Sequence, residues 1–93
     1  MTTIGVPREI KTDENRVAVT PDGVREAIAA GLEVVVESGA GAGSSITDAE
    51  YAAAGATVAP VDEVWERADL VCKVKEPQPE EMDRMRPGLV LLT

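Results

Sequence analysis

The 93 residues suffice for one small domain, and a formal net charge of −8 without any histidine argues against non-specific binding to nucleic acid or anionic membranes. The apolar 44% of the chain is almost entirely aliphatic, since the chain has no phenylalanine, one tyrosine and one tryptophan. A single cysteine excludes an internal disulfide, and no apolar stretch approaches the roughly 20 residues of a membrane span.

The amino end, Met1 to Pro7, lacks the basic and apolar regions of a secretory signal peptide. Cys72 lies on the apolar side of a predicted strand, which indicates a buried and unreactive thiol. Together these features predict a protein of the reducing cytoplasm, without nucleic acid or a membrane among its partners.

The first predicted elements are a strand over residues 3–6 and, after it, a charged irregular stretch over residues 8–20. Charged loops between packed elements often carry function, but a solvated connector would have the same composition, so both interpretations stay open. Thr20 is typical of an N-cap and Pro21 of a first helical position, which together predict a helix over residues 21–30.

Gly31 is expected to end this helix in the left-handed conformation. Residues 32–36 then form a nearly continuous β-branched run, the pattern of a strand buried on both faces. A strand, a helix and a second strand in this order predict a right-handed parallel crossover.

A glycine-rich stretch over residues 37–45 invites comparison with the dinucleotide fingerprint, but it does not match. The fingerprint requires a third glycine where Ser44 stands, and counting from Gly41 instead puts Ile46 at that position. The next helix begins only at Thr47, which opens a capping-box pattern. The stretch is therefore interpreted as a structural turn rather than a nucleotide site.

The rest of the chain continues the alternation of strands and helices. Further strands are expected over residues 56–58, 70–74 and 89–92, and further helices over residues 48–54, 61–67 and 79–85. This pattern predicts a three-layer α/β fold with a mainly parallel sheet, either Rossmann-like or flavodoxin-like, without the nucleotide fingerprint.

Two lysines stand at the end of the predicted strand over residues 70–74. By the alternation of a strand, Lys73 and Lys75 share one face, and Pro77 prevents the strand from continuing. Ligands of open α/β sheets bind outside the carboxyl ends of the strands, so the two lysines are a candidate anion site. Spacing alone leaves open that both are solvated charges at an edge.

Six blocks occur in a characteristic order along essentially the whole chain. They are Ile4–Glu9, Glu14–Pro21, Val36–Gly41, Tyr51–Ala56, Val64–Trp65 and Lys73–Pro77. Taken together, they resemble the amino-terminal domain shared by alanine dehydrogenases and the α-subunits of proton-translocating transhydrogenases. The Glu-Asn-Arg ahead of Val17 and the second lysine, Lys75, look like the dehydrogenase branch, since transhydrogenase α-subunits typically lack that lysine.

The resemblance implies that residues 1–93 are the amino-terminal part of the substrate domain of an NAD-dependent alanine dehydrogenase, an oxidoreductase of amino-acid catabolism. By that resemblance Arg16 holds the carboxylate of alanine or pyruvate, and Lys75 is both substrate-binding and catalytic, facing the keto oxygen or the amine. No residue of this chain is expected to bind the cofactor or a metal, because NAD is held by a domain absent from the chain. The family's catalytic histidine is also absent from the chain, so the chain alone is expected to be inactive. The resemblance further implies that the full-length parent is a homo-oligomer.

Two other interpretations are weighed against this one. The chain could instead be the corresponding domain of a transhydrogenase α-subunit. It could also be a receiver-like signalling domain, with Asp13 and Glu14 as the acidic pair, but Asp69 precedes its strand where a receiver needs an aspartate at the carboxyl end.

Overall fold

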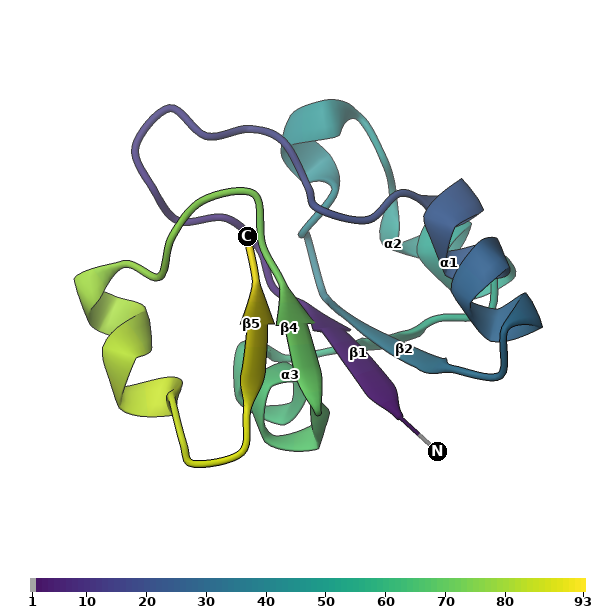
Figure 1. The fold of residues 1–93 in the computed structure, drawn as a ribbon. Helices are drawn as coiled ribbons and strands as arrows, with labels where there is room; N and C mark the ends of the chain where they lie inside the picture. Colours follow the sequence, from purple (N-terminus) through teal and green to yellow (C-terminus); the bar gives the residue numbers. More distant parts are fainter. Residues whose placement is uncertain (1) are drawn as a thin grey trace.

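The computed structural model describes residues 2–93 as a single parallel sheet of five strands with the order β3-β2-β1-β4-β5 (Figure 1). The strands are β1 (Thr3–Val6), β2 (Glu33–Glu37), β3 (Thr57–Ala59), β4 (Leu70–Cys72) and β5 (Val90–Leu92). The central strand β1 pairs with β2 on one side and β4 on the other, so the strand order reverses between β1 and β4.

This order decides between the two arrangements expected from the sequence. It is the Rossmann-type order, in which the first strand is central and strands two and three extend to one side. A receiver-like domain has the flavodoxin-type order, in which β1 lies between β2 and β3. The receiver interpretation is therefore wrong, because here β2 separates β1 from β3.

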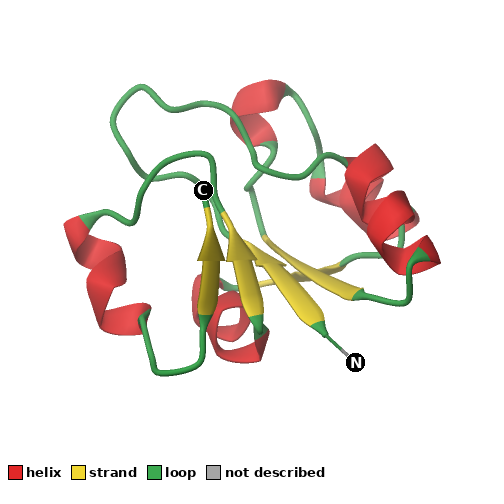
Figure 2. Cartoon of the chain, in the orientation of Figure 1, coloured by secondary structure: helices red, strands yellow, loops and turns green. Residues whose placement is uncertain are grey.

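Helices cover both faces of the sheet, which confirms the predicted three layers (Figure 2). The α-helices are α1 (Pro21–Ala29), α2 (Asp48–Ala53) and α3 (Val61–Arg67), and two 3₁₀ helices are η1 (Ala42–Ser44) and η2 (Pro79–Arg84). Helices α1 and α2 pack on one face and α3 packs on the other. Among residues 2–93, no helix has the length and apolar character needed to cross a membrane.

The caps expected from the sequence are present. The hydroxyl of Thr20 accepts a hydrogen bond from Gly23 N at 3.4 Å, and Thr47 and Glu50 form a complete capping box. Gly31 ends α1 with a φ of +88°, a conformation that glycine adopts without steric cost. Most predicted boundaries agree with the structure within one residue.

Two elements differ from their predictions. The segment expected as a helix over residues 79–85 is the 3₁₀ helix η2, whose short span begins with Pro79 and is closed by hydrogen bonds between Gln78 and Glu81. The strand expected over residues 70–74 ends at Cys72. Of its last two expected residues, Lys73 still donates its backbone N–H to Leu92 O at 2.9 Å, whereas the N–H of Val74 is bound by a side chain described below.

The core confirms that β2 is buried on both faces. Val34 and Val36 pack with α1 and α2, whereas Val35 packs on the α3 side of the sheet. Trp65 of α3 is 2% exposed and packs with Val71 of β4. The aliphatic residues thus form two thin layers that the sheet separates.

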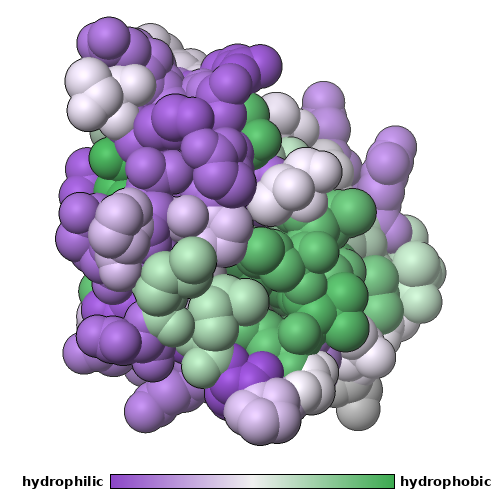
Figure 3. Space-filling view, turned by 60° about the vertical axis from the view of Figure 1, so that its left-hand side comes forward, coloured by the Kyte–Doolittle hydropathy of each residue, from purple (hydrophilic) through white to green (hydrophobic). Residues whose placement is uncertain are grey.

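One half of the sheet carries no helix on its α1 side within residues 2–93. The strand register puts Ile4, Leu70 and Cys72 on this face, with Val90 and Leu92 beside them on the edge strand. Val90 and Leu92 are each 58% exposed, and this half of the sheet contributes to the apolar surface in Figure 3. Cys72 is consequently half-buried rather than buried as predicted, although its partial burial still raises the pKa of the thiol.

Candidate functional site

The segments that follow β1 and β4 leave the same edge of the sheet, where the strand order reverses (Figure 1). In open α/β sheets the crevice at such a reversal is where ligands bind. The segment after β1 carries Glu9, Glu14 and Arg16, and the segment after β4 carries Lys73 and Lys75. The candidate site is therefore built from two loops that are distant in sequence and adjacent in space.

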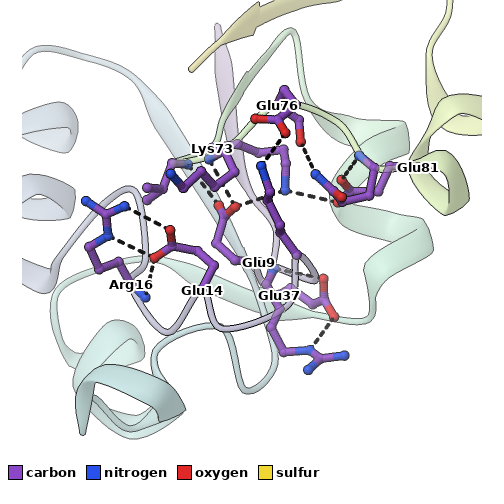
Figure 4. Close-up of polar contacts among 12 residues, drawn as sticks. Glu9, Glu14, Arg16, Glu37, Lys73, Glu76 and Glu81 are labelled. Carbon is purple, nitrogen blue, oxygen red and sulfur yellow. Dashed lines mark hydrogen bonds and ion pairs between the residues drawn. The ribbon is translucent and has the colours of Figure 1, made fainter.

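Lys73 is the buried centre of this region (Figure 4). Its Nζ lies 3.2 Å from Glu9 Oε1 and 3.1 Å from Glu81 Oε2, and the side chains of Lys73 and Glu9 are each 1% exposed. A lysine enclosed by two carboxylates offers no free positive charge to a ligand. Neither interpretation of Lys73 from the sequence, as part of an anion site or as a solvated edge charge, is correct.

Glu9 organises the backbone that leads to Lys75. Its Oε2 accepts a hydrogen bond from Val74 N at 2.9 Å, and its Oε1 accepts one from Lys75 N at 3.3 Å. Because these N–H groups bind a carboxylate, they are withdrawn from the sheet and β4 stops at Cys72. The strand alternation that would put Lys73 and Lys75 in the same surroundings is thereby broken. Lys73 is buried and Lys75 stays partly exposed.

Arg16 lies in the loop after β1 and is paired with Glu14. Arg16 Nε lies 2.8 Å from Glu14 Oε2, and Arg16 Nη2 lies 2.8 Å from Glu14 Oε1 (Figure 4). The Arg16 side chain is 67% exposed, whereas that of Glu14 is 6% exposed. The hydrogen bonds from Arg16, reinforced by the positive charge of Lys75, lower the pKa of Glu14 to about 2, so its carboxyl is ionised at neutral pH.

The strand order brings the two predicted site residues to the same edge of the sheet, Arg16 in the loop after β1 and Lys75 in the loop after β4. The Lys75 ammonium and the Arg16 guanidinium both act on the same Glu14 carboxylate, one through space and the other through hydrogen bonds. An exposed arginine and a partly exposed lysine at one edge of the sheet suit the binding of a small organic acid.

The glycine-rich loop after β2 supports the Arg16 segment. A Cβ on Gly43 would lie 2.7 Å from the carbonyl oxygen of Asn15, and Ser44 Oγ donates to that same oxygen at 3.0 Å. The absence of a side chain at Gly43 therefore lets the backbone before Arg16 rest directly on the loop. Between them lies a small pocket of about 120 Å³, whose lining includes Arg8, Glu9, Glu14, Arg16 and Gly43.

Sequence reasoning named Arg16 and Lys75 but gave no role to Glu9, Glu14 or Glu81. Glu14 enters the sequence predictions only through the Glu-Asn-Arg motif and the receiver-like acidic pair. A carboxylate that pairs with a distant lysine leaves no spacing pattern in the sequence, so the fold is needed to recognise it. Within residues 2–93, no group of three or more Cys, Asp or Glu side chains is arranged to hold a metal ion.

Comparison with protein families matches residues 5–93 to the family described as alanine dehydrogenase/PNT, N-terminal domain. An alanine dehydrogenase of Bacillus subtilis is 54% identical over 91 residues, which cover 97% of this chain and 24% of that protein. An alanine dehydrogenase of Methanococcus maripaludis is 52% identical over 91 residues, with the same two shares. The chain thus spans about a quarter of the length of the curated relatives it matches.

Two solved structures share the fold. An L-alanine dehydrogenase superposes with a TM-score of 0.92 at 44% identity, covering 97% of this chain and 25% of that one. A transhydrogenase from Sinorhizobium meliloti superposes with a TM-score of 0.89 at 37% identity, covering 96% of this chain and 26% of that one. Both similarities extend over nearly all of the described residues.

Proposed function

The chain belongs to the family of alanine dehydrogenase and transhydrogenase amino-terminal domains, and from this premise we propose that it is the amino-terminal part of the substrate domain of an NAD-dependent alanine dehydrogenase. The full-length enzyme would convert L-alanine to pyruvate and ammonia, reversibly. The observation that carries the proposal is that an exposed arginine in the loop after β1 and a partly exposed lysine in the loop after β4 lie at the same edge of the sheet, whereas the neighbouring Lys73 is buried in ion pairs with Glu9 and Glu81.

In this proposal Arg16 binds the carboxylate of the substrate. A guanidinium is planar and can donate two parallel hydrogen bonds to a carboxylate, which fixes the orientation of the acid as well as its position. Arg16 is exposed enough to receive a ligand from solvent. Because alanine and pyruvate carry the same carboxylate, this contact serves both directions of the reaction.

Lys75 would act at the second carbon of the substrate. Its ammonium would face the keto oxygen of pyruvate or the amine of alanine and oppose the negative charge that develops on oxygen when the carbonyl is attacked. Glu9 supports this role by binding the backbone N–H of Lys75, which limits how far the loop can move. A cation that already faces the reacting oxygen lowers the activation barrier of the chemical step, because the protein does not have to rearrange when the charge develops.

NAD, which would supply the hydride chemistry, does not fit the residues of this chain. The glycine-rich loop forms the 3₁₀ helix η1 and packs against Asn15, so its glycines are used for contact within the protein. We therefore propose that a nucleotide-binding domain of the full-length protein holds NAD. We also propose that other parts of that protein cover the open apolar half of the sheet, because the relatives are about four times as long as this chain.

The transhydrogenase branch of the family is the less favoured candidate. The transhydrogenase structure is 37% identical to this chain, compared with 44% for the L-alanine dehydrogenase structure. Lys75, which the resemblance associates with the dehydrogenase branch, is present. We propose that the full-length enzyme is cytoplasmic and forms a homo-oligomer.

We expect the full-length protein to form NADH from NAD only when L-alanine is added, and the isolated 93-residue chain to form none at any concentration. In our proposal NAD is bound by another domain, and the sequence of this chain contains no histidine. The measurement is the absorbance of NADH during steady-state turnover, with D-alanine as the control substrate. Turnover by the purified chain alone, or alanine-independent turnover by the full-length protein, would contradict the proposal.

A further inference from the structure

We propose that Glu14 is a positioning residue for the substrate, because it holds the Arg16 guanidinium from the side and leaves the end of the fork free for the substrate carboxylate. The inference rests on the proposed role of Arg16 as the carboxylate-binding residue. It concerns how that arginine is oriented, which similarity to relatives does not address.

The hydrogen bonds between the two side chains use one specific edge of the guanidinium. Glu14 accepts from Arg16 Nε and Nη2, each at 2.8 Å, and its Oε2 also accepts from Arg16 N at 3.0 Å. Arginine has five side-chain N–H donors, and a carboxylate can bind either the Nε/Nη2 edge or the Nη1/Nη2 end. Within residues 2–93 no acceptor binds Nη1, so the Nη1/Nη2 end remains open to a second carboxylate.

The turn that carries Glu14 explains why it acts as the fixed partner. Asp13 adopts a left-handed φ of +66°, and Glu14 N donates to Lys11 O at 3.0 Å, which closes a tight turn. The turn directs the Glu14 side chain inward, where it is 6% exposed, while Arg16 is 67% exposed. A buried carboxylate therefore anchors an exposed arginine, which reduces the rotamer freedom that the arginine would lose on binding a ligand.

The charge of Glu14 also sets the net charge of the proposed substrate site. Glu14 lies within the electrostatic influence of Lys75 as well as of Arg16, and these three groups together carry one net positive charge. That charge matches an acid with a single carboxylate. Because the pKa of Glu14 is lowered to about 2, mainly by the hydrogen bonds from Arg16, its carboxyl is ionised at neutral pH.

The opposite role for Glu14 would be competition, in which it occupies Arg16 until the substrate displaces it. The two roles predict changes of opposite sign when Glu14 is removed. A positioning residue lowers the KM for pyruvate, so its loss raises KM, whereas a competitor raises KM, so its loss lowers it. The geometry favours positioning, since Glu14 uses the side edge and leaves the end of the guanidinium open.

The test is steady-state reductive amination of pyruvate by the full-length enzyme, comparing wild type with Glu14→Ala and Glu14→Gln. We expect Glu14→Ala to raise the KM for pyruvate about tenfold, with a smaller change in kcat and no change in the KM for NADH, because only the orientation of the carboxylate ligand is lost. Glu14→Gln keeps the shape of the side chain and one acceptor, so its KM should lie between those of wild type and Glu14→Ala.

Asp22→Ala is the matched control, since Asp22 pairs with Arg25 at 2.7 Å in an exposed arginine–carboxylate contact on α1 away from the site. Its KM for pyruvate should equal that of wild type. An unchanged or lowered KM in both Glu14 variants, with wild type active on alanine and Arg16→Lys impaired, would overturn the inference and leave the proposed function standing. A wild-type enzyme without alanine-dependent activity would overturn both.

Discussion

Lys75→Ala in the full-length enzyme is expected to lower kcat at least a hundredfold, with a smaller effect on the KM for pyruvate. Removing a charge aimed at the reacting oxygen removes stabilisation that is specific to the transition state, on the order of 3–4 kcal/mol. The structure leaves Lys75 partly exposed at the edge where the strand order reverses, with its backbone fixed by Glu9. Steady-state kinetics in the direction of reductive amination gives both constants.

Arg16→Lys is the comparison that separates binding from chemistry. Lysine keeps the positive charge but loses the planar fork, so this variant should act mainly on the KM for pyruvate. Lys73→Ala supplies the second comparison, since Lys73 is the neighbouring lysine on the same loop. If a folded Lys73→Ala enzyme loses turnover while Lys75→Ala keeps it, the catalytic role has been given to the wrong lysine.

Lys73→Ala is expected instead to lower the free energy of unfolding by about 3–5 kcal/mol, the usual cost of removing one partner from a buried ion pair. Glu9 and Glu81, whose side chains are 1% and 6% exposed, would be left buried next to each other without their cation. The loop that presents Lys75 is bound by the same Glu9, so it should loosen as well. Urea unfolding of the chain, followed by the fluorescence of its single tryptophan, Trp65, measures the change.

Lys11→Ala is the matched control for this loss of stability. Lys11 Nζ lies 2.6 Å from Glu76 Oε1, but the two side chains are 40% and 62% exposed. An exposed pair contributes about 0–1 kcal/mol, so the urea midpoint of this variant should stay close to that of wild type. Equal and small losses in Lys11→Ala and Lys73→Ala would show that the buried cluster does not stabilise the fold.

Much of the fold follows from local signals. Thr20, Pro21 and Thr47 mark helix starts through hydrogen bonds made within a few residues, and the β-branched run around Val35 indicates a strand buried on both faces. These signals depend on residues close together in the chain, so they can be recognised from the sequence alone. The strand order did not follow from them, because nothing local states whether β1 is flanked by β2 and β4 or by β2 and β3.

The site was predictable only in part, and for a related reason. Alternation along a strand placed Lys73 and Lys75 together, and it failed because Glu9, more than sixty residues earlier in the chain, binds the backbone after Cys72. The carboxylate of Glu9 also forms a buried ion pair with Lys73. The choice of Arg16 and Lys75 came from resemblance to a family. The roles of Glu9 and Glu14 became evident only from the structure, which places the loop after β1 next to the loop after β4.

The central claim is that the edge between β1 and β4 binds a small 2-oxo acid through Arg16 and Lys75. The most direct test is a crystal structure of the full-length protein with pyruvate bound. We expect the pyruvate carboxylate on the Nη1/Nη2 end of Arg16, with Glu14 still on the other edge, and the keto oxygen within hydrogen-bond distance of Lys75 Nζ. Pyruvate bound without contact to either residue, or bound to Lys73 after its release from Glu9, would contradict it.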